Sequence, residues 1–142
     1  MTNDRIDSNR RFIEGKVLLI DDEAVVREIG SEMLESLGLE CITATDGQEG
    51  VKLYKQFEPS INLVILDVEM PGISGDKVFD LLKEINPGVK ILVISGYTKT
   101  HLESNFFQRN LKNFMPKPFQ LKQLTAKLTV MIGRKTDEQD IL

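Results

Sequence analysis

Short runs of apolar residues alternate along the chain with longer segments of helical periodicity. Three of the runs are nearly continuous and rich in branched side chains, at residues 16–20, 63–66 and 90–94. Runs of this length that end at polar or turn-forming residues are typical of strands buried on both faces of a sheet. Two further strands are predicted at 39–44, where apolar and polar residues alternate, and within 113–119.

Helical spacing of apolar residues separates the predicted strands. It is clearest over residues 24–37, where apolar side chains recur every three or four positions and Gly38 ends the helix. Further helices are predicted at 50–57, 78–85, 98–110 and 120–132. Five strands that alternate with five helices indicate a single α/β domain with a parallel sheet covered on both faces.

Two of the strands suggest the order of the sheet. Pro116 lacks a backbone N–H and therefore belongs in an edge strand, and the half-polar strand at 39–44 suits the other edge. The doubly wound, flavodoxin-like order 2-1-3-4-5 satisfies both conditions and places the first and third strands side by side. We predict one domain over residues 16–132, between a flexible leader at 1–15 and a polar tail at 133–142.

Composition and charge narrow the possible functions. A chain of 142 residues with 41% hydrophobic content can form one domain with a substantial core. The net charge of −4 argues against binding of nucleic acid. The single cysteine, Cys41, excludes an internal disulfide, and no apolar run approaches the roughly 20 residues needed to cross a membrane. We therefore expect a cytoplasmic protein with no membrane association.

Polar side chains gather where the predicted strands end. Asp21 and Asp22 follow the first strand, Asp67 the third, Ser95 the fourth, and Lys117 the fifth. The carboxyl ends of parallel strands form one rim, so the three carboxylates are expected to meet there. Their mutual repulsion requires a counter-charge, which Mg²⁺ with its preference for oxygen ligands supplies. A carboxylate, a metal, a lysine and a hydroxyl together are suited to accepting a phosphoryl group.

This set of motifs resembles the receiver domain of response regulators in two-component signalling. The resemblance covers about residues 16–132 and rests on four motifs: Asp21-Asp22, Asp67 followed by Met70-Pro71-Gly72, Ser95-Gly96, and Lys117-Pro118-Phe119. It implies that Asp67 accepts a phosphoryl group from a histidine kinase or a histidine phosphotransfer protein. It also implies that the chain then signals to a protein target and is not an enzyme acting on a separate substrate.

The same resemblance implies roles for the other residues. Asp21, Asp22 and Asp67 would bind Mg²⁺ together with the backbone carbonyl of Glu69, and Lys117 would contact the phosphoryl group. In the signalling switch, Ser95 would supply the hydroxyl and Phe114 the aromatic ring that changes rotamer. The Lys117–Pro118 peptide bond would be cis, an isomer that is uncommon even before proline.

Two departures from the family pattern bear on the lifetime of the phosphorylated state. The residue two positions after Asp67 is acidic, Glu69, and the residue two positions after Ser95 is bulky, Tyr97. Both positions flank the route by which water would reach the phosphoryl group. The switch hydroxyl is a serine in place of the commoner threonine, a substitution that the family also uses.

Several alternatives remain at this point. Taken singly, Asp22 or Glu23 could be a helix cap, Lys117 a solvated charge and Phe114 a core residue. The main functional alternative is a metal-dependent phosphohydrolase with Asp67 as nucleophile, although such enzymes typically carry a second Asp where this chain has Glu69. A flavin-binding function is disfavoured, because the chain has no Ser/Thr/Gly-rich phosphate-binding loop after the first strand. A partner-binding domain without phosphorylation is disfavoured because every acidic and lysine position is filled.

Overall fold

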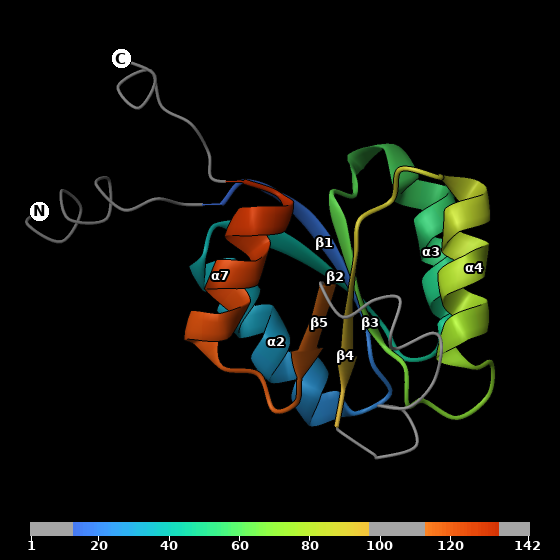
Figure 1. The fold of residues 1–142 in the computed structure, drawn as a ribbon, viewed down its shortest axis with the longest axis horizontal. Helices are drawn as coiled ribbons and strands as arrows, with labels where there is room; N and C mark the ends of the chain where they lie inside the picture. The colour runs from blue at the N-terminus through green and yellow to red at the C-terminus, as the bar shows by residue number, and fades with distance from the viewer. Residues whose placement is uncertain (1–12, 97–112, 134–142) are drawn as a thin grey trace, which may run out of the picture.

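The sheet has the strand order expected from the sequence. The computed structural model describes residues 13–96 and 113–133. Its five strands form one parallel sheet in the order β2-β1-β3-β4-β5 (Figure 1). The strands are β1 (Gly15–Ile20), β2 (Leu39–Ala44), β3 (Leu63–Asp67), β4 (Ile91–Ser95) and β5 (Phe114–Pro116). The predicted flavodoxin-like topology is therefore confirmed.

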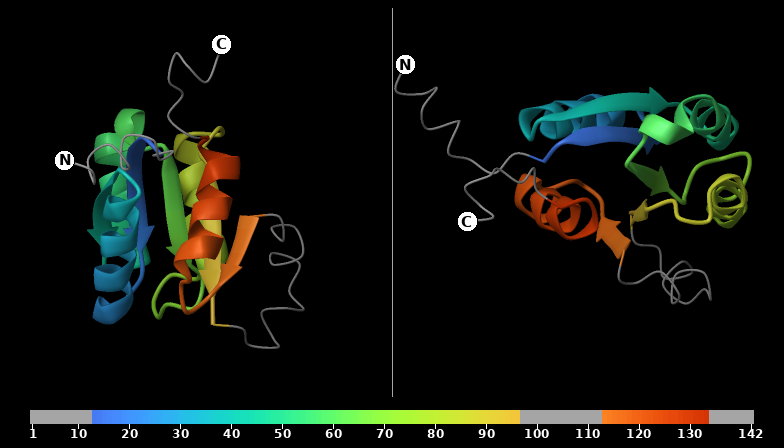
Figure 2. Two further views of the ribbon diagram at one scale, coloured as in Figure 1. Left: turned by 90° about the vertical axis from the view of Figure 1, so that its left-hand side faces the viewer. Right: turned by 90° about the horizontal axis from the view of Figure 1, so that it is seen from above.

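Four α-helices and one short 3₁₀ helix accompany the sheet in the described part of the chain. They are α2 (Ala24–Ser36), α3 (Gly47–Phe57), α4 (Gly75–Ile85), α7 (Leu121–Met131) and the 3₁₀ helix η1 (Glu58–Ser60). Helices α2 and α7 cover one face of the sheet, and α3 and α4 cover the other (Figures 1 and 2). The helix predicted at 98–110 and most of the predicted leader and tail lie outside the described residues.

Alternate side chains of each central strand enter two separate cores. In β1, Leu18 and Ile20 pack with residues of α3 and α4, whereas Val17 and Leu19 pack with residues of α2 and α7. All four side chains are fully buried. Burial on both faces explains why the sequence of β1 shows a continuous apolar run and no alternation.

Some elements begin earlier than their apolar pattern predicts, because polar caps start them. Helix α3 begins at Gly47, where Asp46 accepts a hydrogen bond from the Glu49 backbone N–H at 2.8 Å.

At the amino end of the domain, Ile13 is buried and donates its N–H to the Leu37 carbonyl at 3.0 Å. The fold thus begins before residue 16.

The chain between β3 and α4 packs tightly against itself. Gly72 has a φ of 91°, a backbone conformation that side-chain-bearing residues rarely adopt. A Cβ atom at Gly75 would lie 2.6 Å from the Cα of Val68, the residue after Asp67. Glycine at position 75 therefore allows the start of α4 to lie directly beneath the end of β3.

No helix among the described residues is long and apolar enough to cross a membrane.

Candidate functional site

Three aspartates meet at the carboxyl ends of β1 and β3, which are neighbours in the sheet. Asp67 is the last residue of β3, and Asp21 and Asp22 directly follow β1. Each aspartate offers a carboxylate oxygen within 4.8 Å of those of the other two. Asp21 and Asp67 are buried, whereas Asp22 is exposed. The structure therefore brings together the acidic cluster that the strand order predicted.

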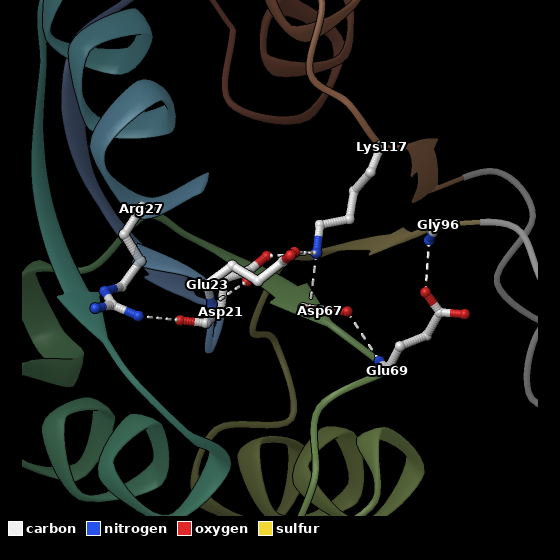
Figure 3. A network of polar contacts seen from close by, with 7 residues as sticks. All are labelled: Asp21, Glu23, Arg27, Asp67, Glu69, Gly96 and Lys117. Carbon is white, nitrogen blue, oxygen red and sulfur yellow. Dashed lines mark hydrogen bonds and ion pairs between the residues drawn. The ribbon is translucent and has the colours of Figure 1, made fainter. Parts of the chain in front are cut away.

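Backbone amides hold one oxygen of each buried carboxylate. Asp67 Oδ1 accepts a hydrogen bond from the Glu69 N–H at 2.8 Å, and Asp21 Oδ1 accepts one from the Glu23 N–H at 2.9 Å. Arg27 of α2 donates from Nη1 to the backbone carbonyl of Asp21 at 2.9 Å (Figure 3). Both carboxylates are thus fixed in orientation, with their Oδ2 atoms toward the side chain of Lys117.

Lys117 lies among three carboxylates (Figure 3). Its ammonium nitrogen is 2.8 Å from Glu23 Oε1, 3.0 Å from Asp21 Oδ2 and 3.1 Å from Asp67 Oδ2. The Lys117 backbone N–H donates to the Ser95 carbonyl at 2.9 Å, and the Lys117–Pro118 peptide bond is cis. A single positive charge thereby offsets part of the negative charge at the rim.

Burial and charge shift the pKa values of these groups. The pKa of Asp67 is raised to about 6. Burial is the largest cause and raises it, the Glu69 N–H lowers it, the charge of Asp21 raises it, and Lys117 lowers it. Burial by itself would lower the pKa of Lys117, but its contacts with Glu23, Asp21 and Asp67 raise that pKa above its ordinary value. Hydrogen bonding to Lys117 lowers the pKa of Glu23. At neutral pH, Asp67 is therefore mostly a carboxylate and Lys117 is charged.

The donor atoms suit a hard divalent cation. All three clustered side chains are carboxylates, and hard cations such as Mg²⁺ are bound by oxygen ligands. Asp21 Oδ2 is buried and accepts no hydrogen bond from the described residues, although the Lys117 ammonium lies 3.0 Å away as an ion pair. A cation would supply this oxygen with a further partner.

The expected switch residues lie along the strands next to the acidic cluster. Ser95 is the last residue of β4 and is buried. Phe114 opens β5, opposite Val93, and packs against the core between the sheet and the α3–α4 layer. Ser95 and Lys117 thus share one rim with Asp67, while Phe114 lies further back along β5. Tyr97 lies outside the described residues.

The sequence matches the family described as the response regulator receiver domain over residues 17–129. The chain belongs to the receiver family. The chemotaxis protein CheY of Treponema pallidum is 29% identical to this receiver over 133 residues, a match that covers 92% of each protein. The sensor kinase CckA of Brucella abortus is 31% identical over 119 residues, which are 84% of this chain and 13% of CckA. The receiver thus spans nearly all of one relative and a small part of the other.

A solved relative supports the same assignment. The response regulator TrrA of Thermotoga maritima, solved in complex with Mg(2+)-BeF, is 33% identical and has a TM-score of 0.70, with 82% of this chain and 98% of that chain covered. TrrA has also been solved in complex with the histidine kinase ThkA, and that structure aligns with a TM-score of 0.71 at 32% identity, covering 83% of this chain and 98% of TrrA.

Two acidic side chains of this receiver have contacts that the sequence did not indicate. Glu23 is at the N-cap position of α2 but makes no capping hydrogen bond with its side chain, because its carboxylate pairs with Lys117. The Glu69 carboxylate accepts a hydrogen bond from the Gly96 N–H at 2.7 Å. For the contact of Glu23 with Lys117, the sequence signal is the acidic run from Asp21 to Glu23. The contact of Glu69 with Gly96 has no signal in the sequence.

Proposed function

We propose that this receiver accepts a phosphoryl group on Asp67 from a histidine kinase or a histidine phosphotransfer protein, in a reaction that requires Mg²⁺. The observation that carries the proposal is the position of the Lys117 ammonium, 3.1 Å from the buried Asp67 carboxylate and beside the Asp21 and Asp22 cluster. Phosphoryl transfer depends on positioning and on stabilisation of charge, and these groups offer both.

The Asp67 carboxylate is the nucleophile in this proposal. One of its oxygens attacks the phosphorus of a phosphohistidine, a P–O bond forms as the P–N bond breaks, and the imidazole leaves. The Glu69 N–H holds Asp67 Oδ1, which fixes the carboxylate plane during the attack. Lys117 contacts the incoming phosphoryl oxygens as a point charge.

Asp21, Asp22, Asp67 and the backbone carbonyl of Glu69 are the proposed ligands of Mg²⁺. When bound, Mg²⁺ would offset the negative charge of the phosphoryl oxygens in the transition state. Asp21 is held ready for this role, because the Glu23 N–H fixes its Oδ1 atom.

Ser95 and Phe114 are the proposed switch. The Ser95 hydroxyl would donate a hydrogen bond to the phosphoryl group, and the Phe114 ring would change rotamer as the chain around Ser95 moves. The two residues are linked through the pairing of β4 and β5, in which Ser95 lies opposite Pro116 and Val93 lies opposite Phe114. The downstream partner would bind the surface that includes β5 and α7.

We also propose that the chain catalyses only its own phosphorylation and dephosphorylation. In the phosphohydrolase alternative, Glu69 would have to act as acid and base on a separate substrate, but its carboxylate is engaged by the Gly96 N–H. Membership of the receiver family supports a signalling role. The complex of TrrA with a histidine kinase supports a kinase as phosphodonor. The cytoplasmic location stays a prediction.

Phosphorylation with a small-molecule donor tests the proposal. Acetyl phosphate and Mg²⁺ should add one phosphoryl group to the intact chain, detected by mass spectrometry. EDTA and the Asp67→Asn substitution should each abolish the addition. Labelling that persists in Asp67→Asn, or that is insensitive to EDTA, would refute the assignment of Asp67 and Mg²⁺.

A further inference from the structure

The Glu69 side chain lies across the gap between β3 and β4 at the rim. Asp67 pairs with Ile94 in the sheet, and the Val68 N–H donates to the Ile94 carbonyl at 3.1 Å. Glu69 and Gly96 are each two residues beyond this pair, and the Glu69 carboxylate accepts the Gly96 N–H at 2.7 Å (Figure 3). The contact therefore connects the chain that follows Asp67 with the chain that follows Ser95.

The Gly96 N–H is suited to binding an anion. It follows the last residue of β4, and its partner in the structure is a carboxylate oxygen. Hydrogen bonds from backbone N–H groups to anionic oxygens are shorter and stronger than those between neutral groups. Gly96 also permits close approach, since a Cβ atom at this position would lie 3.1 Å from Glu69 Oε1. In this structure a carboxylate of the chain itself accepts the N–H of the residue that follows Ser95.

A phosphoryl group on Asp67 would bring more negative charge to this place. A phosphoryl group carries about 1.5 to 2 negative charges at neutral pH and has three strong acceptor oxygens. The Glu69 carboxylate oxygen already accepts the Gly96 N–H, so a phosphoryl oxygen that reached this N–H would have to displace it.

We propose that the Glu69 carboxylate is a built-in competitor of the phosphoryl group, and that it holds the Ser95–Gly96 chain in place until phosphorylation displaces it. The inference rests on the proposed function of Asp67. In this role Glu69 is a positioning residue that lowers the affinity of the site for an anion, while its negative charge favours the cation. Its removal should therefore affect the two ligands in opposite directions.

Two substitutions separate the charge of Glu69 from its hydrogen bond. Glu69→Gln removes the charge but keeps an oxygen that can accept the Gly96 N–H, whereas Glu69→Ala removes both. Glu84→Gln is the matched control, because Glu84 is exposed on α4 and the substitution changes the net charge equally. The probes are beryllofluoride, a phosphoryl mimic, at saturating Mg²⁺, and Mg²⁺ alone, each titrated into the full chain.

Both Glu69 variants should bind beryllofluoride more tightly than the wild type, by roughly three- to tenfold. Both should bind Mg²⁺ more weakly, and Glu84→Gln should match the wild type. Without ligands, the Gly96 amide proton resonance should move upfield in Glu69→Ala and stay near its wild-type position in Glu69→Gln. A merely structural role for Glu69 would weaken the binding of both ligands.

Wild-type affinity for beryllofluoride in both variants, or weaker binding of both ligands, would overturn the role of Glu69 and leave Asp67 phosphorylation intact. If the wild type fails to bind beryllofluoride with Mg²⁺, the proposed function fails, and the role of Glu69 fails with it.

Discussion

The ammonium of Lys117 lies closer to the exposed carboxylate of Glu23, at 2.8 Å, than to the buried carboxylate of Asp67, at 3.1 Å. Lys117 and Glu23 are 94 residues apart in sequence. The lysine proposed to contact the phosphoryl group is therefore shared with a residue at the outer edge of the site.

Glu23→Gln should make Lys117 more available to an incoming phosphoryl group. Removing the charge also lowers the repulsion of the donor by the acidic rim, so phosphorylation by acetyl phosphate should be faster by roughly two- to fivefold. The rate can be followed by mass spectrometry at fixed Mg²⁺. Glu28→Gln on the exposed side of the same helix is the control. Equal rates in Glu23→Gln and Glu28→Gln would show that the pair with Glu23 does not restrain Lys117.

Asp67→Asn should stabilise the metal-free protein at pH 8. The pKa of Asp67 is raised from 3.8 to about 6 in the folded state, so the folded state binds more protons than the unfolded state between these values. Stability from this group therefore falls as the pH rises through that window. The shift corresponds to about 3 kcal/mol at most, an upper limit for the gain in Asp67→Asn.

Thermal unfolding in EDTA at several pH values measures this gain. The difference in melting temperature between Asp67→Asn and the wild type should be several degrees at pH 8 and should vanish near pH 4. Added Mg²⁺ should narrow the difference at pH 8, because only the wild type keeps the complete set of carboxylate ligands. A difference that does not depend on pH would argue against a buried, charged Asp67.

Ser95→Ala should still accept a phosphoryl group but should switch incompletely. Inverting an equilibrium from about 1:99 to 99:1 needs roughly 5.5 kcal/mol of differential stabilisation, whereas one charge-assisted hydrogen bond contributes only about 1.5–3 kcal/mol. Lys117 must therefore supply part of the difference. NMR shift changes over residues 113–131 on addition of beryllofluoride should be smaller in Ser95→Ala and in Lys117→Ala. Full-sized changes in the double variant would mean that the signal leaves the site by another route.

Gly75→Ala should destabilise the domain and disturb the chain after Asp67. The added Cβ would lie 2.6 Å from the Cα of Val68, a backbone atom that can move only with the end of β3. Overpacking of this kind typically costs about 1–3 kcal/mol. Gly88→Ala is a matched control, since its Cβ would meet only the Asn86 side chain at 3.5 Å. Urea denaturation should give a clearly lower midpoint for Gly75→Ala, and similar midpoints for the two variants would contradict the packing argument.

The sequence predicted those features that depend on regular patterns. Strands β1, β3 and β4 are buried on both faces, so their apolar runs marked them clearly, and Pro116 and the half-polar β2 identified the two edges. The strand order then brought Asp21, Asp22 and Asp67 together. The starts of α3 and α4 were missed by three residues each, because Asp46 and Ser74 cap these helices ahead of their first apolar positions.

The side-chain pairings of the site could not be predicted from such patterns. Each position on the rim is set by the fold, but which carboxylate Lys117 contacts depends on side-chain rotamers and on competition among nearby charges. Glu23 looked like a helix cap because it precedes α2. Its actual partner, Lys117, follows β5 and is far away in the sequence. The contact of Glu69 with Gly96 likewise joins two loops and gives no periodic signal.

The strand that carries Phe114 is also the shortest in the sheet. β5 has three residues and, within the described part of the chain, pairs with β4 alone, whereas β1 and β3 are central strands with a partner on each side. Amide hydrogens in β1 and β3 should therefore exchange with solvent mainly through global unfolding. Those of β5 should exchange through smaller local openings of lower free energy. Phosphorylation is then expected to change exchange rates at this edge first, while the amides beneath Asp21 and Asp67 stay protected.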